Sequence, residues 1–269
     1  MRLLFLLLLF ASPLLASPKI LVSIAPEKYL VDRITNNTLD VEILVPSGAS
    51  PHSYEPSLRQ MMDVFQCVLW FRIGENFENQ VVEVLSPHME IIDLREGVEL
   101  LPLSCCHHSK DAHDSHTWLS PKLLKIQAVA IAEGLKQQFP EHSPLFIENL
   151  SSLLNELDLL DQDITKQLDS RKIDTILVSH PAFGYFCREY GLKQLSIEVE
   201  GKEPSPKQVT SLLKEARLHK IRQVYVQPQY SRKGADRVAH ELKAQIVLLD
   251  PYEEDVVGNL RTLAKVISR

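Results

Sequence analysis

The chain has 269 residues, of which 45% are hydrophobic and 24% are charged, a composition typical of globular proteins rather than disordered or fibrous ones. Its formal net charge of −6 argues against a nucleic-acid partner, which would require a surface rich in Lys and Arg. No two of its nine glycines are separated by a single residue, so a Gly-x-Gly dinucleotide loop is absent, and so is a Walker-type phosphate loop. Nucleotide chemistry of these kinds is excluded.

The beginning of the chain has the pattern of a secretory signal. Arg2 gives a positive start, and residues 3–16 form a largely apolar run of 14 residues, which is too short to span a bilayer. We therefore expect residues 1–16 to be a signal peptide, cleaved after Ala16, and the mature protein to be periplasmic. An uncleaved N-terminal anchor is the alternative. No cysteine precedes Cys67, so we expect no lipid anchor.

In the first half of the chain, short apolar runs precede a helical pattern. Ser120 and Pro121 suit the cap and the first position of a helix, and we expect that helix to end near Phe139, where Pro140 stops it. The expected strands in this half are residues 19–23, 41–45, 67–71 and 91–93.

A second helix is predicted to be unusually long. It starts with the same Ser-Pro pattern at Ser143, and its apolar residues recur every three or four positions. From Pro144 to Asp169 it would extend about 39 Å at 1.5 Å per residue.

After this helix the strand–helix alternation resumes, which implies parallel sheets with covering helices. The sequence predicts an α/β fold with two lobes, residues 17–143 and 171–269, joined by a long rigid helix over residues 144–170. In the second lobe we expect strands at 175–178, 194–197, 223–226 and 245–249, and helices from Pro206 and over 234–243.

Four residues that can bind a metal lie beside these elements. His52 is in the loop after the second strand, His180 and Asp250 come directly after later strands, and His116 precedes the helix that begins at Pro121. Ligands of open parallel sheets bind beyond the carboxyl ends of the strands. Three imidazoles with one carboxylate suit zinc. Taken singly, each histidine is equally explained as a surface residue, and Asp250 as a turn former before proline.

A different signal is the polar tract from residue 105 to residue 113. It holds His107, His108 and His113, and tracts of this kind bind metal loosely, so an auxiliary metal loop is expected there. A mobile loop with chance histidines is the alternative. The next residue, Asp114, either accepts a hydrogen bond from an imidazole or begins a helix.

The four cysteines do not suggest a disulfide framework. Cys105 and Cys106 are adjacent, and a bridge between neighbours needs a strained geometry. Cys67 and Cys187 lie in apolar stretches, as buried thiols do. We predict no pairing.

Taken together, these segments give the chain a wider resemblance. It resembles the metal-binding family of periplasmic substrate-binding proteins that serve ABC importers of zinc and manganese. The matching segments follow the family's order and span essentially the whole mature chain. They are residues 23–29, 48–56, 114–121, 179–186, 200–205, 227–229 and 249–251.

The resemblance implies two α/β lobes, a rigid linking helix and one metal in the cleft between the lobes. By position, the family's ligands correspond to His52, His116, His180 and Asp250. The implied role is high-affinity capture of a divalent metal in the periplasm and its delivery to an ABC permease and its ATPase in the inner membrane. The resemblance further implies a monomer that is neither an enzyme nor membrane-spanning.

Zn²⁺ is the predicted cargo, with manganese or iron as the alternative. Manganese members of the family typically have a glutamate where His180 stands, and the histidine-rich tract also points to zinc. Some zinc members use a glutamate directly before the first histidine, but Pro51 stands here, which makes Asp250 the predicted fourth ligand. Ser115 and Gln227 also depart from the family, which often has proline and usually glutamate at these positions.

Two other functions are weighed against this one. A zinc hydrolase would need a placed general base, yet the chain has no His-Glu-x-x-His or Gly-x-Ser-x-Gly motif, and Glu55 is a weakly placed candidate. The other function is that of a metal-independent adhesin, which would be a second role of the protein.

Overall fold

The computed structural model describes residues 18–102, 113–198 and 202–269. The predicted signal peptide, His107 and His108 lie outside these residues. Among the helices of the described residues, none is both long enough and apolar enough to cross a membrane.

The first lobe is a four-stranded parallel sheet covered on both faces. Its strands, in the order β2-β1-β3-β4, are β1 (Lys19–Val22), β2 (Asp40–Ile43), β3 (Cys67–Arg72) and β4 (Glu90–Asp93). Its helices are α1 (Ala25–Thr35), α2 (Leu58–Val64), α3 (Glu78–Leu85) and α4 (Pro121–Gln138). Side chains alternate along a strand, so Ile20 and Val22 join the core under α1 and α4 while Leu21 packs under α2 and α3.

The second lobe repeats this plan. Its parallel sheet has the order β6-β5-β7-β8, with strands β5 (Thr175–Val178), β6 (Lys193–Ser196), β7 (Gln223–Val226) and β8 (Gln245–Leu248). Its helices are α6 (Gly184–Glu189), α7 (Pro206–Leu218), α8 (Lys233–Leu242) and α9 (Val256–Ile267). One face of the sheet packs on α7 and α8, and the other on α6 and α9.

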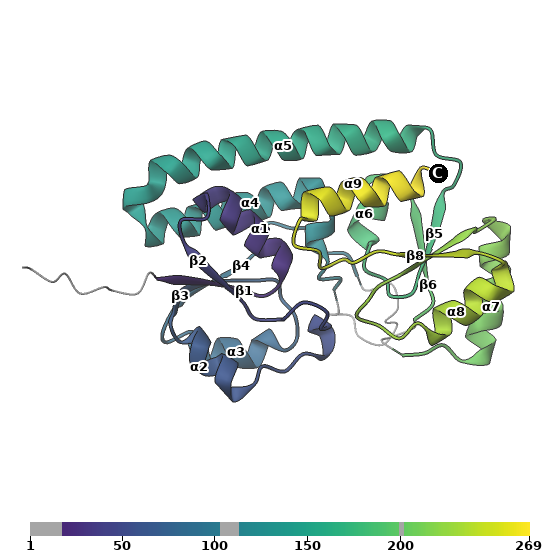
Figure 1. Cartoon of the computed structure of the whole chain (residues 1–269), viewed down its shortest axis with the longest axis horizontal. Helices are drawn as coiled ribbons and strands as arrows, with labels where there is room; N and C mark the ends of the chain where they lie inside the picture. The colour runs from purple at the N-terminus through teal and green to yellow at the C-terminus, as the bar shows by residue number, and fades with distance from the viewer. Residues whose placement is uncertain (1–17, 103–112, 199–201) are drawn as a thin grey trace, which may run out of the picture.

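The helix α5 (Ser143–Asp169) runs along both lobes (Figure 1). It contacts α1 and α4 of the first lobe and α9 of the second. One face of the helix is buried throughout its length, and one core cluster continues from the first sheet through α5 to the second sheet. The buried residues of α5 are Phe146, Leu153, Leu157, Leu160, Ile164 and Leu168.

The fold class predicted from the sequence is confirmed, and each predicted strand lies within two residues of an observed one. Patterning did not predict α1, α2, α3, α6 and α9. The structure also adds three short 3₁₀ turns: η1 (Pro51–Ser53), η2 (Thr117–Leu119) and η3 (Pro140–His142). Cys67 and Cys187 are buried thiols, as expected.

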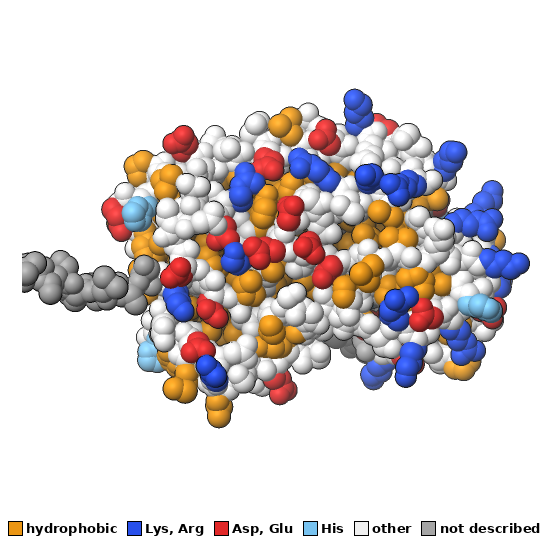
Figure 2. Space-filling view, viewed as in Figure 1, with side chains coloured by type: hydrophobic (Ala, Val, Ile, Leu, Met, Phe, Trp, Pro, Cys, Tyr) orange, Lys and Arg blue, Asp and Glu red, His pale blue; other side chains and the backbone are white. Residues whose placement is uncertain are grey.

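The two halves differ in charge. Residues 171–269 hold 17 Lys and Arg against 12 Asp and Glu, whereas residues 17–170 hold 11 against 23. In Figure 2, Lys and Arg side chains accordingly gather over the end formed by the second lobe. The acidic balance of the whole chain therefore comes from the first lobe and α5.

Candidate metal centre

The two sheets bring three histidines into one place. His52 lies on η1 after β2, His116 directly precedes η2, and His180 follows β5 by two residues. His116 is 1% exposed and His180 is 7% exposed, whereas the His52 side chain is 32% exposed. The centre therefore draws two histidines from the first lobe and one from the second, and His52 is its most exposed member.

Three imidazole nitrogens converge at this centre. One ring nitrogen from each of His52, His116 and His180 lies within 4.8 Å of the other two. The Nε2 atoms of His52 and His180 are 3.1 Å apart. Ligands about 2.0–2.1 Å from a tetrahedral zinc lie about 3.3–3.4 Å from each other, so this spacing suits one small ion.

Each histidine also has a carboxylate on its other ring nitrogen. A carboxylate oxygen accepts a hydrogen bond from Nδ1–H, which leaves the Nε2 lone pair free for a metal. The separations between Nδ1 and the carboxylate oxygen are 2.9 Å for His52 and Glu75, 2.7 Å for His116 and Asp114, and 2.8 Å for His180 and Glu198. The three carboxylates select the tautomer that zinc requires, and their charge offsets that of a divalent ion.

The pair of His52 and Glu75 is further held by Ser115. The Ser115 hydroxyl donates to the second oxygen of Glu75, whose side chain is 4% exposed. Burial opposes ionisation of Glu75, but hydrogen bonds from His52 and Ser115 outweigh it and lower the pKa of this carboxyl to about 2. Burial likewise opposes protonation of His52, yet Glu75 raises the pKa of His52 above its usual value. Ser115, a departure from the family pattern, thus supports the centre.

His180 has a different electrostatic environment. Burial lowers its pKa to about 4, and the hydrogen bond to Glu198 only partly opposes this. The imidazole of His180 is therefore neutral at neutral pH and able to bind a metal.

Gln227 fixes the backbone of His180. Its side chain is fully buried, and its Oε1 accepts hydrogen bonds from the His180 amide at 3.0 Å and from the Ser179 hydroxyl. Its Nε2 donates to the His180 carbonyl oxygen at 3.0 Å. An ionised glutamate could not make this last bond, so the glutamine specifically suits this peptide.

The loop before His116 depends on a close approach by α6. A Cβ atom added to Gly184 would lie 2.6 Å from an Asp114 carboxylate oxygen. The Tyr185 hydroxyl donates to the Asp114 carbonyl oxygen at 2.7 Å. Glycine at the start of α6 therefore allows this helix to approach the Asp114 carboxylate that faces Nδ1 of His116.

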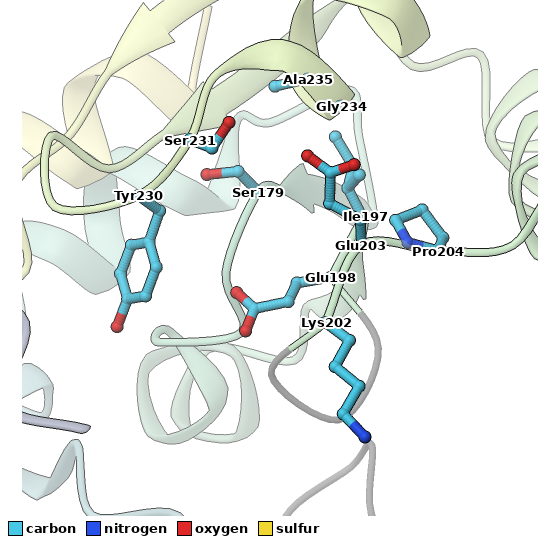
Figure 3. A pocket seen from close by; sticks show the side chains of 10 residues that line it. All are labelled: Ser179, Ile197, Glu198, Lys202, Glu203, Pro204, Tyr230, Ser231, Gly234 and Ala235. Carbon is cyan, nitrogen blue, oxygen red and sulfur yellow. The ribbon is translucent and has the colours of Figure 1, made fainter. Parts of the chain in front are cut away.

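A pocket of about 150 Å³ lies beside His180 in the second lobe, lined among others by Ser179, Glu198 and Tyr230 (Figure 3). Because Glu198 hydrogen-bonds Nδ1, the pocket borders the side of the imidazole remote from the converging Nε2 atoms. It is a cavity behind the histidine cluster and not the cluster itself.

The fourth predicted ligand, Asp250, does not lie in the cluster. One of its carboxylate oxygens accepts hydrogen bonds from Gln229 Nε2 at 2.8 Å and from the Tyr252 amide at 2.9 Å. Among the described His, Cys, Asp and Glu residues, one group has potential ligand atoms that all lie within 4.8 Å of one another. That group comprises the three histidines and does not include Asp250. A direct bond from Asp250 to the metal stays a prediction.

The predicted auxiliary loop falls mostly outside the described residues. Of its three histidines only His113 is described, and it is exposed and forms an isolated antiparallel bridge with Pro102.

Sequence reasoning did not identify Glu75 and Glu198. Each lies two or three residues beyond a strand, β3 and β6, in the same relation to its sheet as His180 to β5. That shared position was the available signal, but acidic residues are common enough in loops for it to be weak.

Comparison with known proteins gives one consistent result. The chain is 38% identical over 272 residues to a putative metal-binding protein of Chlamydia trachomatis serovar D, covering 98% of each chain. It is 26% identical to the high-affinity zinc uptake system protein ZnuA of Haemophilus influenzae, covering 96% of this chain and 90% of that one.

Solved structures agree with these relatives. A crystal structure of ZnuA superposes with a TM-score of 0.89 at 33% identity, covering 94% of this chain and 98% of the other. The periplasmic zinc-binding protein TroA from Treponema pallidum, at 19% identity and a TM-score of 0.84, shares the fold. The model of the periplasmic component A of zinc-uptake complexes, ZnuA, matches residues 20–268. The chain therefore belongs to this family of substrate-binding transport proteins, which are not enzymes.

Proposed function

We propose that this protein captures one Zn²⁺ in the periplasm with His52, His116 and His180, and delivers it as a monomer to the permease of an ABC importer. The observation that carries the proposal is the convergence of three imidazoles, each with a carboxylate on Nδ1. Neutral imidazole suits zinc, while manganese prefers oxygen ligands. The family and the names of its relatives support zinc as cargo.

The first test is the metal content of the mature chain. Protein purified without added metal and then dialysed against equal zinc and manganese should hold one tightly bound zinc per molecule, because the described residues offer one three-histidine cluster. Structural zinc sites contribute roughly 10–16 kcal/mol, so the dissociation constant should be nanomolar or below. Elemental analysis measures the content, and preferential loading with manganese would refute zinc as the cargo.

The second test changes the metal preference. In His180→Glu, a carboxylate replaces one imidazole, so the ratio of zinc affinity to manganese affinity should fall by about tenfold or more, since tenfold corresponds to about 1.4 kcal/mol. Competition titration measures the ratio. His142→Glu is the matched control, because His142 is exposed at the amino-terminal end of α5, where a carboxylate is tolerated. A ratio equal in His180→Glu and wild type would place His180 outside the metal shell.

A further inference from the structure

Three histidines leave one side of a tetrahedral ion open. In the second lobe, β8 is followed by Asp250 and then Tyr252, and the Tyr252 side chain reaches His116 of the cluster. Its hydroxyl lies 3.4 Å from Nε2 of His116. Its ring lies beside the rings of His116 and Trp118, with centroids 6.2 and 5.7 Å away.

Two separations at the centre are close to those between ligands of one tetrahedral zinc. The edge of such a tetrahedron is the distance between two ligand atoms, which is about 3.3–3.4 Å when each ligand lies at a zinc–nitrogen distance from the ion. One edge joins His52 and His180, whose Nε2 atoms are 3.1 Å apart, and the opposite edge joins His116 and Tyr252 at 3.4 Å. The phenol oxygen therefore lies at ligand-to-ligand spacing from Nε2 of His116.

Asp250 supports the turn that carries Tyr252. Its carboxylate accepts the Tyr252 backbone N–H at 2.9 Å and the Gln229 amide at 2.8 Å, and its own carbonyl oxygen accepts a hydrogen bond from Asn259 at 2.7 Å. These bonds fix the turn that carries Tyr252.

A second tyrosine covers the neighbouring face. The Tyr230 ring stacks on His180 with centroids 4.2 Å apart and planes 11° apart. Its hydroxyl accepts a hydrogen bond from Ser50 of the first lobe at 3.2 Å. Two phenol rings thus cover the cluster from the second lobe and disfavour the larger oxygen-rich shell of six ligands that manganese takes.

We propose that the phenol oxygen of Tyr252 is the fourth ligand of the bound metal, and that Asp250 is a positioning residue that holds the Tyr252 backbone. This assignment rests on the proposed function, since it concerns the same ion.

The test compares Tyr252→Phe with the wild-type chain. Removing one ligand oxygen while keeping the ring should weaken zinc binding by about tenfold or more in competition with a chromophoric chelator. Cobalt is the spectroscopic probe, because its visible absorption is strong when four-coordinate and weaker at higher coordination. Tyr252→Phe should change the wild-type cobalt spectrum, because the phenol oxygen is lost and water takes its place. Tyr190→Phe is the matched control, since that hydroxyl bonds to Asp161 at 2.8 Å, outside the metal centre.

Asp250→Asn separates the two candidate ligands. If Asp250 only positions Tyr252, Asp250→Asn should lower zinc affinity less than Tyr252→Phe does. Asp250→Asn should also keep the wild-type cobalt spectrum. The assignment is overturned if Asp250→Asn loses that spectrum while Tyr252→Phe keeps it, or if Tyr252→Phe binds zinc as the wild type does. In both cases wild-type zinc binding, and with it the proposed function, would stand. A wild-type chain that fails to bind zinc overturns both.

Discussion

Replacing His116 by alanine is expected to lower zinc affinity more than any other single substitution, by over about 100-fold. Loss of a group that only orients a ligand costs about 10–100-fold, and loss of the ligand itself should exceed that range. His116 is almost completely buried, so water has poor access to the vacated position. The measurement is competition titration against a zinc chelator of known affinity.

Two further variants test whether the loss of zinc affinity in His116→Ala is specific to the metal centre. Asp114→Asn removes the charge that faces Nδ1 of His116 and should fall within the 10–100-fold range. His88→Ala is the matched control, because His88 is an exposed histidine that packs against Phe65 outside the centre. Wild-type affinity in His116→Ala would show that the histidine cluster does not bind the metal.

Zinc binding is also expected to weaken in two steps as the pH falls. A metal needs the unprotonated Nε2, so protons compete below the pKa of each ligand in the metal-free protein. His52 has a raised pKa, hence competition should begin above pH 6.5. His180 has a pKa of about 4, so it should contribute only near that pH. Affinity should therefore already decline between pH 7 and 6 and fall further toward pH 4.

Glu75→Gln tests the cause of the first step. Without the carboxylate, the pKa of His52 should fall, because burial still favours the neutral imidazole and only the charges of Glu198 and Asp114 then oppose it. The onset of competition should move to lower pH, although overall affinity drops because the orienting charge is lost. Zinc titrations at closely spaced pH values measure both effects. An onset that is unchanged in Glu75→Gln would contradict the role assigned to this pair.

The sequence predicted most of the framework because the framework depends on local patterns. Alternating apolar strands and Ser-Pro helix starts are readable along the chain, and α4, α5 and α7 begin within a residue of the predicted positions. The helix α6 was not predicted because its six residues are too few to show a period. The helix α9 could have been predicted, since its apolar residues step by three and four after a capping Asp255.

The residues of the candidate site were likewise predicted only where local sequence patterns place them. His52, His116 and His180 were predicted from their positions beside strand ends and a helix start, which parallel sheets bring together. Glu75 and Tyr252 were not, because their roles depend on the tertiary approach of loops from different strands. Asp250 was predicted as a ligand from its position after a strand and from the resemblance, while the local turn directs one of its carboxylate oxygens toward Gln229 and the Tyr252 amide.

The core that continues through α5 bears on how the protein unfolds. Because residues of both sheets and of α5 belong to one apolar cluster, neither lobe can expose its share without uncovering part of the other. Unfolding should then be a single cooperative event despite two separate sheets. A bound metal that joins His52 to His180 adds its binding free energy to that one event, so an ion at the cleft stabilises even the distant ends of the molecule.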